Sequence, residues 1–99
     1  MKNITAKELE EKLKRGEKIN IIDVREDDEV AQGMIPGAKH IRLGDLPNSL
    51  NNLNKNEHYY IVCHAGGRSA MACEFLMEQG FEVTNMLGGM MAWQGDIKK

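Results

Sequence analysis

A cysteine at the end of an apolar segment is the residue best placed for nucleophilic chemistry. Residues His58–Val62 are aromatic and β-branched, which predicts a buried strand that ends just before Cys63. Residues Ser69–Gln79 then form a predicted helix, and Gly80 follows at the position where glycine often ends one. The sequence therefore places Cys63 between the end of a strand and the first turn of a helix.

The loop after this cysteine favours a negatively charged sulfur. The first turn of a helix carries N–H groups without partners inside the helix, and the helix dipole adds partial positive charge there. Gly66 and Gly67 lack a Cβ, so the loop can curl with its amides turned inward, and Arg68 adds a permanent charge. Lowering the pKa of a free thiol from about 8.5 by about two units makes thiolate the majority form at neutral pH. We predict that Cys63 is the nucleophile.

Strands and helices alternate along the chain, which predicts an α/β fold with a mostly parallel sheet covered on both faces. Thr5 and Glu8 form a predicted capping box for a first helix that ends at Gly16. A frayed tail is predicted after Trp93. The predicted strands are Ile19–Val24, Lys39–Leu43, His58–Val62 and Phe81–Leu87; the other helical segments are Asp27–Gln32, Asp45–Leu53, Ser69–Gln79 and Met90–Trp93.

Four segments, in the same order, resemble the rhodanese-like sulfurtransferase family. They are Asp23–Glu26 followed by Glu29, Gly33–Ala38 with Met34 where the family usually has histidine, the cysteine loop Cys63–Ser69, and Leu87–Trp93. The resemblance implies one rhodanese-like domain over residues 1–99. It also implies a five-stranded sheet with helices on both faces and with Cys63 at its carboxyl edge.

Loop length separates the activities that this resemblance allows. Cys63 to Arg68 is a Cys-x4-Arg pattern, whereas the related dual-specificity phosphatases and arsenate reductases have one more loop residue. The shorter loop suits one extra sulfur atom better than a tetrahedral phosphate. The resemblance thus implies a sulfurtransferase of the thiosulfate (rhodanese) type, in which a Cys63 persulfide forms from a sulfane-sulfur donor. A thiophilic acceptor, such as cyanide, a small thiol or a protein thiol, then takes the outer sulfur.

In this mechanism the loop amides hold the terminal sulfur and stabilise its charge. Arg68 either draws in an anionic donor or acts as a clamp that pairs with an acid such as Glu26, and the sequence favours neither role. His64 is a candidate proton donor, but its loop position favours substrate contact or exposure to solvent. The predicted substrate-binding residues are His64, Ala65, Gly66, Gly67, Arg68 and Ser69.

Three other functions remain open. A small phosphatase or arsenate reductase is disfavoured by the loop length, and a non-catalytic binding module is disfavoured by the presence of Cys63. A persulfide carrier or partner domain, which receives sulfur from a desulfurase and passes it on, would use the same cysteine. Only the identity of the partner separates this last function from the leading one.

Structural roles are favoured for several other polar residues. Cys73 lies on the apolar stripe of its helix, which indicates a core thiol rather than a resolving cysteine. Asp23 and Arg25 are expected to pair locally rather than to shape the rim of the cysteine pocket. His40 has no second metal-type residue at a useful spacing, so we expect a packed or surface histidine and no metal site.

Composition narrows the partners and the compartment. A net charge of −2 argues against nucleic acid and leaves no broad basic face for a membrane. The N-terminus has no apolar signal region, and two cysteines are too few for a disulfide scaffold, which together indicate the cytoplasm. We expect no metal and no organic cofactor. The expected partners are a small-molecule sulfur donor and a thiol acceptor, with a thiol protein or a desulfurase as further candidates.

Overall fold

A computed structural model describes residues 1–99, and its central element is a parallel sheet. The strands lie in the order β1-β5-β4-β2-β3, and every neighbouring pair is parallel. This confirms the predicted α/β fold with a five-stranded sheet. The strands are β1 (Lys2–Thr5), β2 (Asn20–Asp23), β3 (Lys39–His40), β4 (His58–Val62) and β5 (Glu82–Leu87).

Alternate side chains of the central strands enter two separate cores. On β4, Tyr59 and Ile61 belong to one core, and Val62 belongs to the other. Both faces of these strands are covered, which is why the strand sequences are apolar almost throughout. Cys63 continues the alternation and lies on the same side of the sheet as Ile61.

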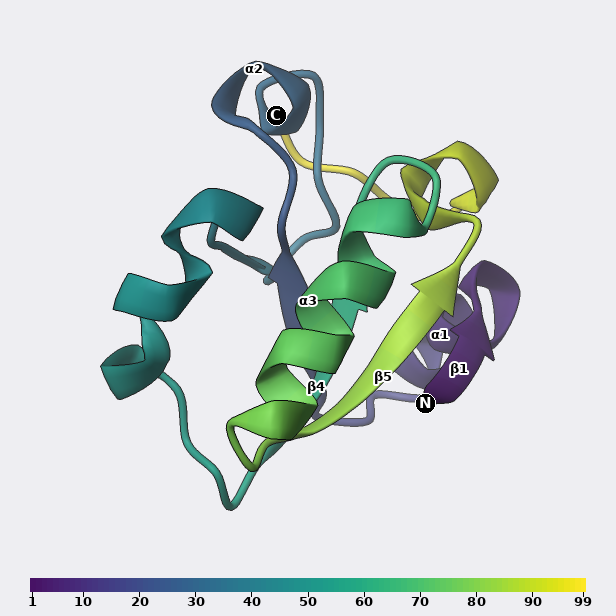
Figure 1. The fold of residues 1–99 in the computed structure, drawn as a ribbon. Coiled ribbons are helices and arrows are strands. Elements are labelled where there is room, and N and C mark those ends of the chain that lie inside the picture. Colours follow the sequence, from purple (N-terminus) through teal and green to yellow (C-terminus); the bar gives the residue numbers. More distant parts are fainter.

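Helices cover both faces of the sheet (Figure 1). Helix α3 (Gly67–Glu78) packs on one face together with two 3₁₀ helices, η1 (Leu43–Asn48) and η2 (Leu50–Asn52). Helix α1 (Ala6–Lys14) and the 3₁₀ helix η3 (Gly89–Ala92) lie on the other face. None of these helices combines the length and the apolar character needed to cross a bilayer.

Local sequence signals set the ends of the two long helices as predicted. Thr5 and Glu8 form the capping box, with the N–H of Glu8 donating to Thr5 Oγ1 at 3.1 Å and the N–H of Thr5 donating to Glu8 Oε1 at 2.9 Å. Gly16 and Gly80 follow α1 and α3 with φ angles of 78° and 92°. Glycine takes this left-handed conformation at little cost, so both helices stop there.

Two predictions about secondary structure were wrong, and one strand was missed. Residues 45–53 form parts of η1 and η2 rather than one helix, because Pro47 lies inside η1 and cannot donate an N–H to an α-helical ladder. The strand predicted over residues 39–43 is only two residues long. Strand β1 was missed because it lies at the sheet edge with only Ile4 buried, so it carries no apolar alternation.

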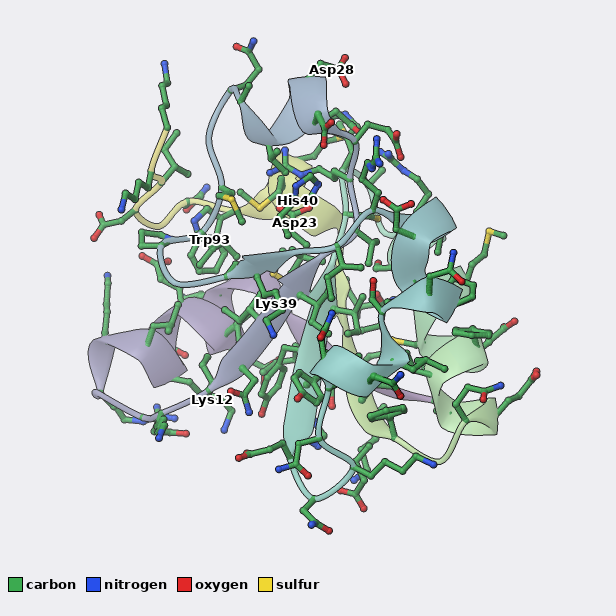
Figure 2. All side chains as sticks on the ribbon, turned by 90° about the vertical axis from the view of Figure 1, so that its left-hand side faces the viewer. Lys12, Asp23, Asp28, Lys39, His40 and Trp93 are labelled. Carbon is green, nitrogen blue, oxygen red and sulfur yellow. The ribbon has the colours of Figure 1, made fainter.

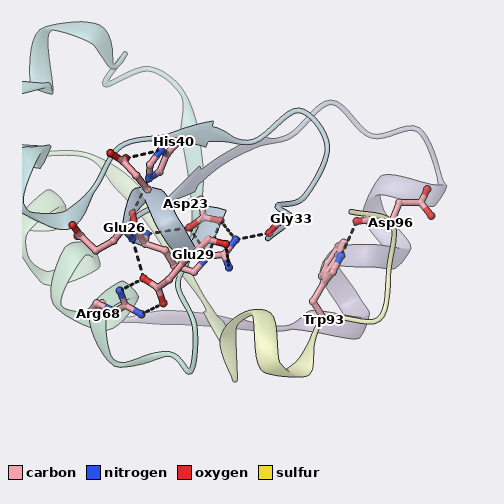
Figure 3. Close-up of polar contacts among 10 residues, drawn as sticks. Asp23, Glu26, Glu29, Gly33, His40, Arg68, Trp93 and Asp96 are labelled. Atoms are coloured by element: carbon pink, nitrogen blue, oxygen red, sulfur yellow. Dashed lines mark hydrogen bonds and ion pairs between the residues drawn. The ribbon is translucent and has the colours of Figure 1, made fainter. Parts of the chain in front are cut away.

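The C-terminal tail is ordered, although the sequence predicted fraying. Met34 and Lys98 exchange two backbone hydrogen bonds of 3.0 and 2.8 Å in an isolated antiparallel bridge. Trp93 lies between α1 and the tail (Figure 2), and its indole N–H donates to the carbonyl of Asp96 at 2.9 Å (Figure 3). The bridge joins distant residues and therefore leaves no local pattern in the sequence.

Candidate active site

Cys63 lies at the carboxyl edge of the sheet, directly after β4 and four residues before α3 begins. The chain reverses direction between these elements at Gly66, whose φ of 112° lies in the left-handed region. A residue with a Cβ would be strained there. Ligand sites in open α/β sheets form at this edge, and the predicted strand–loop–helix arrangement around Cys63 is confirmed.

Hydrogen-bond donors surround the Cys63 sulfur. The N–H of Gly66 donates to Sγ at 3.0 Å, and Ser69 Oγ lies 3.3 Å from Sγ. Burial by itself raises the pKa of Cys63, but hydrogen bonds from the Ser69 hydroxyl and from the backbone of Ser69, Gly66 and Ala65 outweigh it. The pKa of Cys63 is therefore lower than that of an ordinary thiol. The loop favours the thiolate, in the direction that the sequence predicted.

The set of groups around the sulfur is smaller than expected. Inward-turned amides were predicted from His64 to Ser69, yet His64, Gly67 and Arg68 form no hydrogen bond to Sγ. The charge of Arg68 is instead engaged by a carboxylate. Cys63 is only 1% exposed, so its sulfur is almost completely covered in this structure. Substrate binding by His64–Ser69 stays a prediction.

Arg68 is held by an acid, but the acid is Glu29 and not Glu26. Its two terminal nitrogens contact the two carboxylate oxygens of Glu29 at 2.6 and 2.8 Å (Figure 3). Glu29 also accepts the backbone N–H of Glu26, the residue that caps α2 (Asp27–Val30), at 2.9 Å. The Arg68 hydrogen bonds, against the opposing effect of burial, lower the pKa of Glu29 to about 2. Glu26 is the N-cap, whereas Glu29 lies one turn further on, where it reaches α3.

The predicted local pair of Asp23 and Arg25 is confirmed. Both side chains are buried, and Arg25 Nη2 lies 2.8 Å from Asp23 Oδ2 and donates to the carbonyl of Gly33 at 2.9 Å (Figure 3). The ion pair thus holds the segment that leads from β2 to the Gly33 turn. Its hydrogen bonds satisfy two charges that would otherwise be costly to bury.

His40 is a packed histidine, as predicted. Its Nε2 lies 2.7 Å from the carbonyl oxygen of Arg25, and only about a quarter of the side chain is exposed. A polar groove of about 560 Å³ runs from His40 along β3 and η1, but it includes no residue of the cysteine loop. No group of three or more His, Cys, Asp or Glu side chains converges in the structure in a way that could hold a metal ion.

The segment after β5 forms backbone hydrogen bonds to the cysteine loop. The N–H groups of Met90 and Met91 donate to the carbonyls of Cys63 and His64 at 2.8 and 3.0 Å. Gly89 has a φ of 58°, and a Cβ at this position would overlap the backbone of both acceptor residues. Sequence reasoning missed this contact. Its signal is the pair of consecutive glycines that follows a buried strand.

Two further residues on the α3 side of the sheet are buried, and only one of them contacts the cysteine loop. Asn85 on β5 was missed, although an amide in an otherwise apolar strand is a signal in itself; its Oδ1 lies 2.5 Å from Ser69 Oγ. Cys73 is a buried free thiol in the core beneath α3, as predicted. Burial raises the pKa of Cys73 to about 12, so it stays protonated at neutral pH.

A parallel sheet with a low-pKa cysteine in a strand-to-helix loop defines a class of α/β proteins with a cysteine-based site. The family described as Rhodanese-like domain matches residues 5–96, and the chain belongs to this family. "Putative sulfurtransferase YtwF" of Bacillus subtilis (strain 168) is 49% identical over 98 residues, which cover 99% of this chain and 95% of that protein. The matched residues include the whole loop from Cys63 to Ser69.

Two other relatives extend the comparison. "Putative sulfur carrier protein YrkF" of the same organism is 42% identical over 93 residues, which cover 93% of this chain and 50% of that protein. The crystal structure of SSP1007 from Staphylococcus saprophyticus superposes with a TM-score of 0.96 at 43% identity and covers 100% of both chains. The fold described above is thus that of known rhodanese-like proteins.

Proposed function

We propose that this protein is a sulfurtransferase that carries a sulfane sulfur as a persulfide on Cys63. The observation that carries the proposal is that the Gly66 N–H and the Ser69 hydroxyl lie within hydrogen-bond distance of the Cys63 sulfur, and that hydrogen bonds of the loop lower its pKa. The names of YtwF and YrkF, a sulfurtransferase and a sulfur carrier, support the same general chemistry. We further propose the cytoplasm as its compartment, because both cysteines are free thiols.

The reaction has two displacement steps. The Cys63 thiolate attacks the outer sulfur of a donor such as thiosulfate; the new S–S bond forms as the bond to the rest of the donor breaks, and sulfite leaves with the electron pair. An acceptor such as cyanide, a small thiol or a protein thiol then attacks the outer sulfur of the persulfide, and Cys63 leaves as thiolate. Atoms and electrons balance with donor and acceptor alone.

The loop residues divide this work between binding and support. The amides of Ala65, Gly66 and Ser69 stabilise the charge that moves between the two sulfurs. His64 and Gly67 are exposed, and in our proposal they contact the acceptor as it approaches. Arg68 is neutralised by Glu29, so its part in our proposal is to hold the loop rather than to bind the donor.

The burial of Cys63 favours sulfur donors that carry little bulk next to their terminal sulfur. Because only 1% of the residue is exposed, a terminal sulfur on a narrow group needs the smallest displacement of the loop to reach Sγ. The persulfide then places its reactive outer sulfur beyond Sγ and nearer to solvent. This geometry suits thiosulfate, small persulfides and a protein persulfide on a flexible segment.

A persulfide carrier is the second candidate. It is favoured by the match to YrkF, in which a segment like this chain makes up 50% of the protein. In this role a desulfurase or another thiol protein supplies or receives the sulfur, and the chemistry at Cys63 is unchanged. Rapid thiosulfate:cyanide turnover would favour the enzyme, whereas single-round transfer to a protein thiol would favour the carrier.

Intact-mass measurement of the full chain after treatment with thiosulfate tests the proposal. We expect a gain of one sulfur atom on the wild type, reversed by cyanide and absent from Cys63→Ser. Cys73→Ser is the matched control and should still gain the sulfur. An unchanged mass of the folded wild type with thiosulfate and also with glutathione persulfide would contradict the proposal.

A further inference from the structure

The Ser69 hydroxyl has one proton and three neighbours that can accept it. Its oxygen lies 3.3 Å from Cys63 Sγ, 3.1 Å from the carbonyl oxygen of Gly66 and 2.5 Å from Asn85 Oδ1. Cys63, Ser69 and Asn85 are all buried, so the Ser69 hydroxyl finds its hydrogen-bond partners within this cluster. The direction in which Ser69 donates is therefore decided by the other groups in this cluster.

With a neutral thiol the chain of hydrogen bonds is complete. The Cys63 S–H donates to Ser69 Oγ, and the Ser69 O–H donates to Asn85 Oδ1. Loss of the thiol proton to solvent reverses the requirement, because a thiolate only accepts. Ser69 must then turn its proton to the sulfur, which would leave its oxygen facing Asn85 Oδ1 with no hydrogen between them.

An asparagine can resolve this conflict where most side chains cannot. Its amide carries an acceptor oxygen on one side and a donor NH₂ on the other, so a half-turn of the amide presents Nδ2 to Ser69 Oγ. We propose that Asn85 is a positioning residue that makes this turn when Cys63 ionises and thereby commits the Ser69 proton to the sulfur. The inference deepens the proposed function and rests on it for its biological meaning.

The placement of Asn85 in the sheet supports this role. Asn85 and Val83 are two residues apart on β5, so their side chains lie on the same face of the sheet. Val83 belongs to the core beneath α3, the helix that carries Ser69. Asn85 pairs in register with Ile61, two residues before Cys63 on the neighbouring strand. Two adjacent strands and one helix thus fix the three side chains relative to one another.

The charged groups near Cys63 are paired with each other or exposed to water, so Ser69 and Asn85 are the side chains that respond when Cys63 ionises. From α3, Arg68 is matched by Glu29 of α2, and Cys73 stays a neutral thiol because its pKa is about 12. At the end of β2, Asp23 and Arg25 pair with each other, and His64 in the loop is exposed to water.

A double-mutant cycle on the full chain tests the proposal. The readout is the pH midpoint of iodoacetamide alkylation at Cys63, located by mass spectrometry. Asn85→Leu, of similar size and without hydrogen bonds, should raise the midpoint by about half to one pH unit, and Ser69→Ala by about one unit or more. In the Ser69→Ala background, Asn85→Leu should add almost nothing, because Asn85 acts through Ser69.

Thr84→Val is the matched control. Thr84 is the neighbouring buried polar residue of β5, and it bonds His58 on the opposite face at 2.7 Å. The pH midpoint of Cys63 alkylation in Thr84→Val should equal that of the wild type. An Asn85→Leu shift that is absent, or is equally large with and without the Ser69 hydroxyl, would overturn the inference.

A second measurement needs no substitution at Asn85. The side-chain amide proton resonances of Asn85 in the wild type should change with pH at the midpoint of Cys63 alkylation, and they should stay constant in Cys63→Ser. Asn85 amide resonances of the wild type that do not change when Cys63 ionises would refute the proposal. Neither measurement uses a sulfur donor, so they remain decisive if the mass experiment fails, and the mass experiment is equally independent of them.

Discussion

Glu29 accepts hydrogen bonds from both terminal nitrogens of Arg68. Because the two residues are 39 positions apart in sequence, this ion pair connects the short helix α2 to the first turn of α3. The same carboxylate accepts the N–H of Glu26 at the start of α2. One side chain therefore fixes a surface helix and the base of the cysteine loop together. Of the two roles that the sequence left open for Arg68, this arrangement favours the clamp over donor binding.

Glu29→Gln should destabilise the protein by about 1–2 kcal/mol, because a charge-assisted pair becomes a weaker neutral one at a partly exposed site. Urea unfolding at neutral pH measures the change. Asp28→Asn is the matched control, since Asp28 points into solvent from the same helix turn (Figure 2) and forms no ion pair. Equal losses in the two variants would show that the clamp contributes nothing.

The same pair predicts how stability depends on acid. The pKa of Glu29 is about 2 in the folded protein against an ordinary value of 4.5, so the folded state binds this proton less readily than the unfolded state. Its contribution is complete above about pH 4.5 and is lost as the pH falls toward 2. Unfolding free energies measured across this window should fall less steeply in Glu29→Gln than in the wild type. Parallel curves would contradict the assignment.

Gly89→Ala should be far more damaging than an ordinary glycine substitution. Its Cβ would overlap the backbone carbonyls of Cys63 and His64, so the loop must shift as well as the turn. We expect a loss of several kcal/mol and slower alkylation of Cys63. Gly16→Ala is the control, because Gly16 also has a positive φ but no atom near its Cβ position. It should cost only about 1 kcal/mol and leave alkylation unchanged.

Cys73→Ala should separate packing from chemistry. The side chain is fully buried in the core beneath α3, so its loss should cost about 1–2 kcal/mol of stability. Sulfur transfer should persist at the wild-type rate, because a thiol with a pKa of about 12 stays protonated. Unfolding by urea and a thiosulfate:cyanide assay on the same sample check both halves. Loss of turnover in a stable variant would restore the resolving role.

Several features of the fold follow from local patterns. The capping box at Thr5, the glycines after α1 and α3, and the apolar strand before Cys63 each act through neighbours in the chain, so their sequence signals are strong. Elements that depend on distant partners were missed or mistaken. Strand β1 exists through its pairing with β5, and the tail is ordered by its bridge to Met34.

The candidate site divides along the same line. The residue types and spacing from Cys63 to Ser69 already required a thiolate-favouring loop at a helix start, because the donors belong to the loop itself. Only the tertiary structure decided that Glu29 engages Arg68, that Gly89 lies under the loop and that Asn85 meets Ser69. Each of these three contacts joins residues that are far apart in the sequence and that only the folded sheet brings together. Interactions between sequence neighbours therefore cannot predict them.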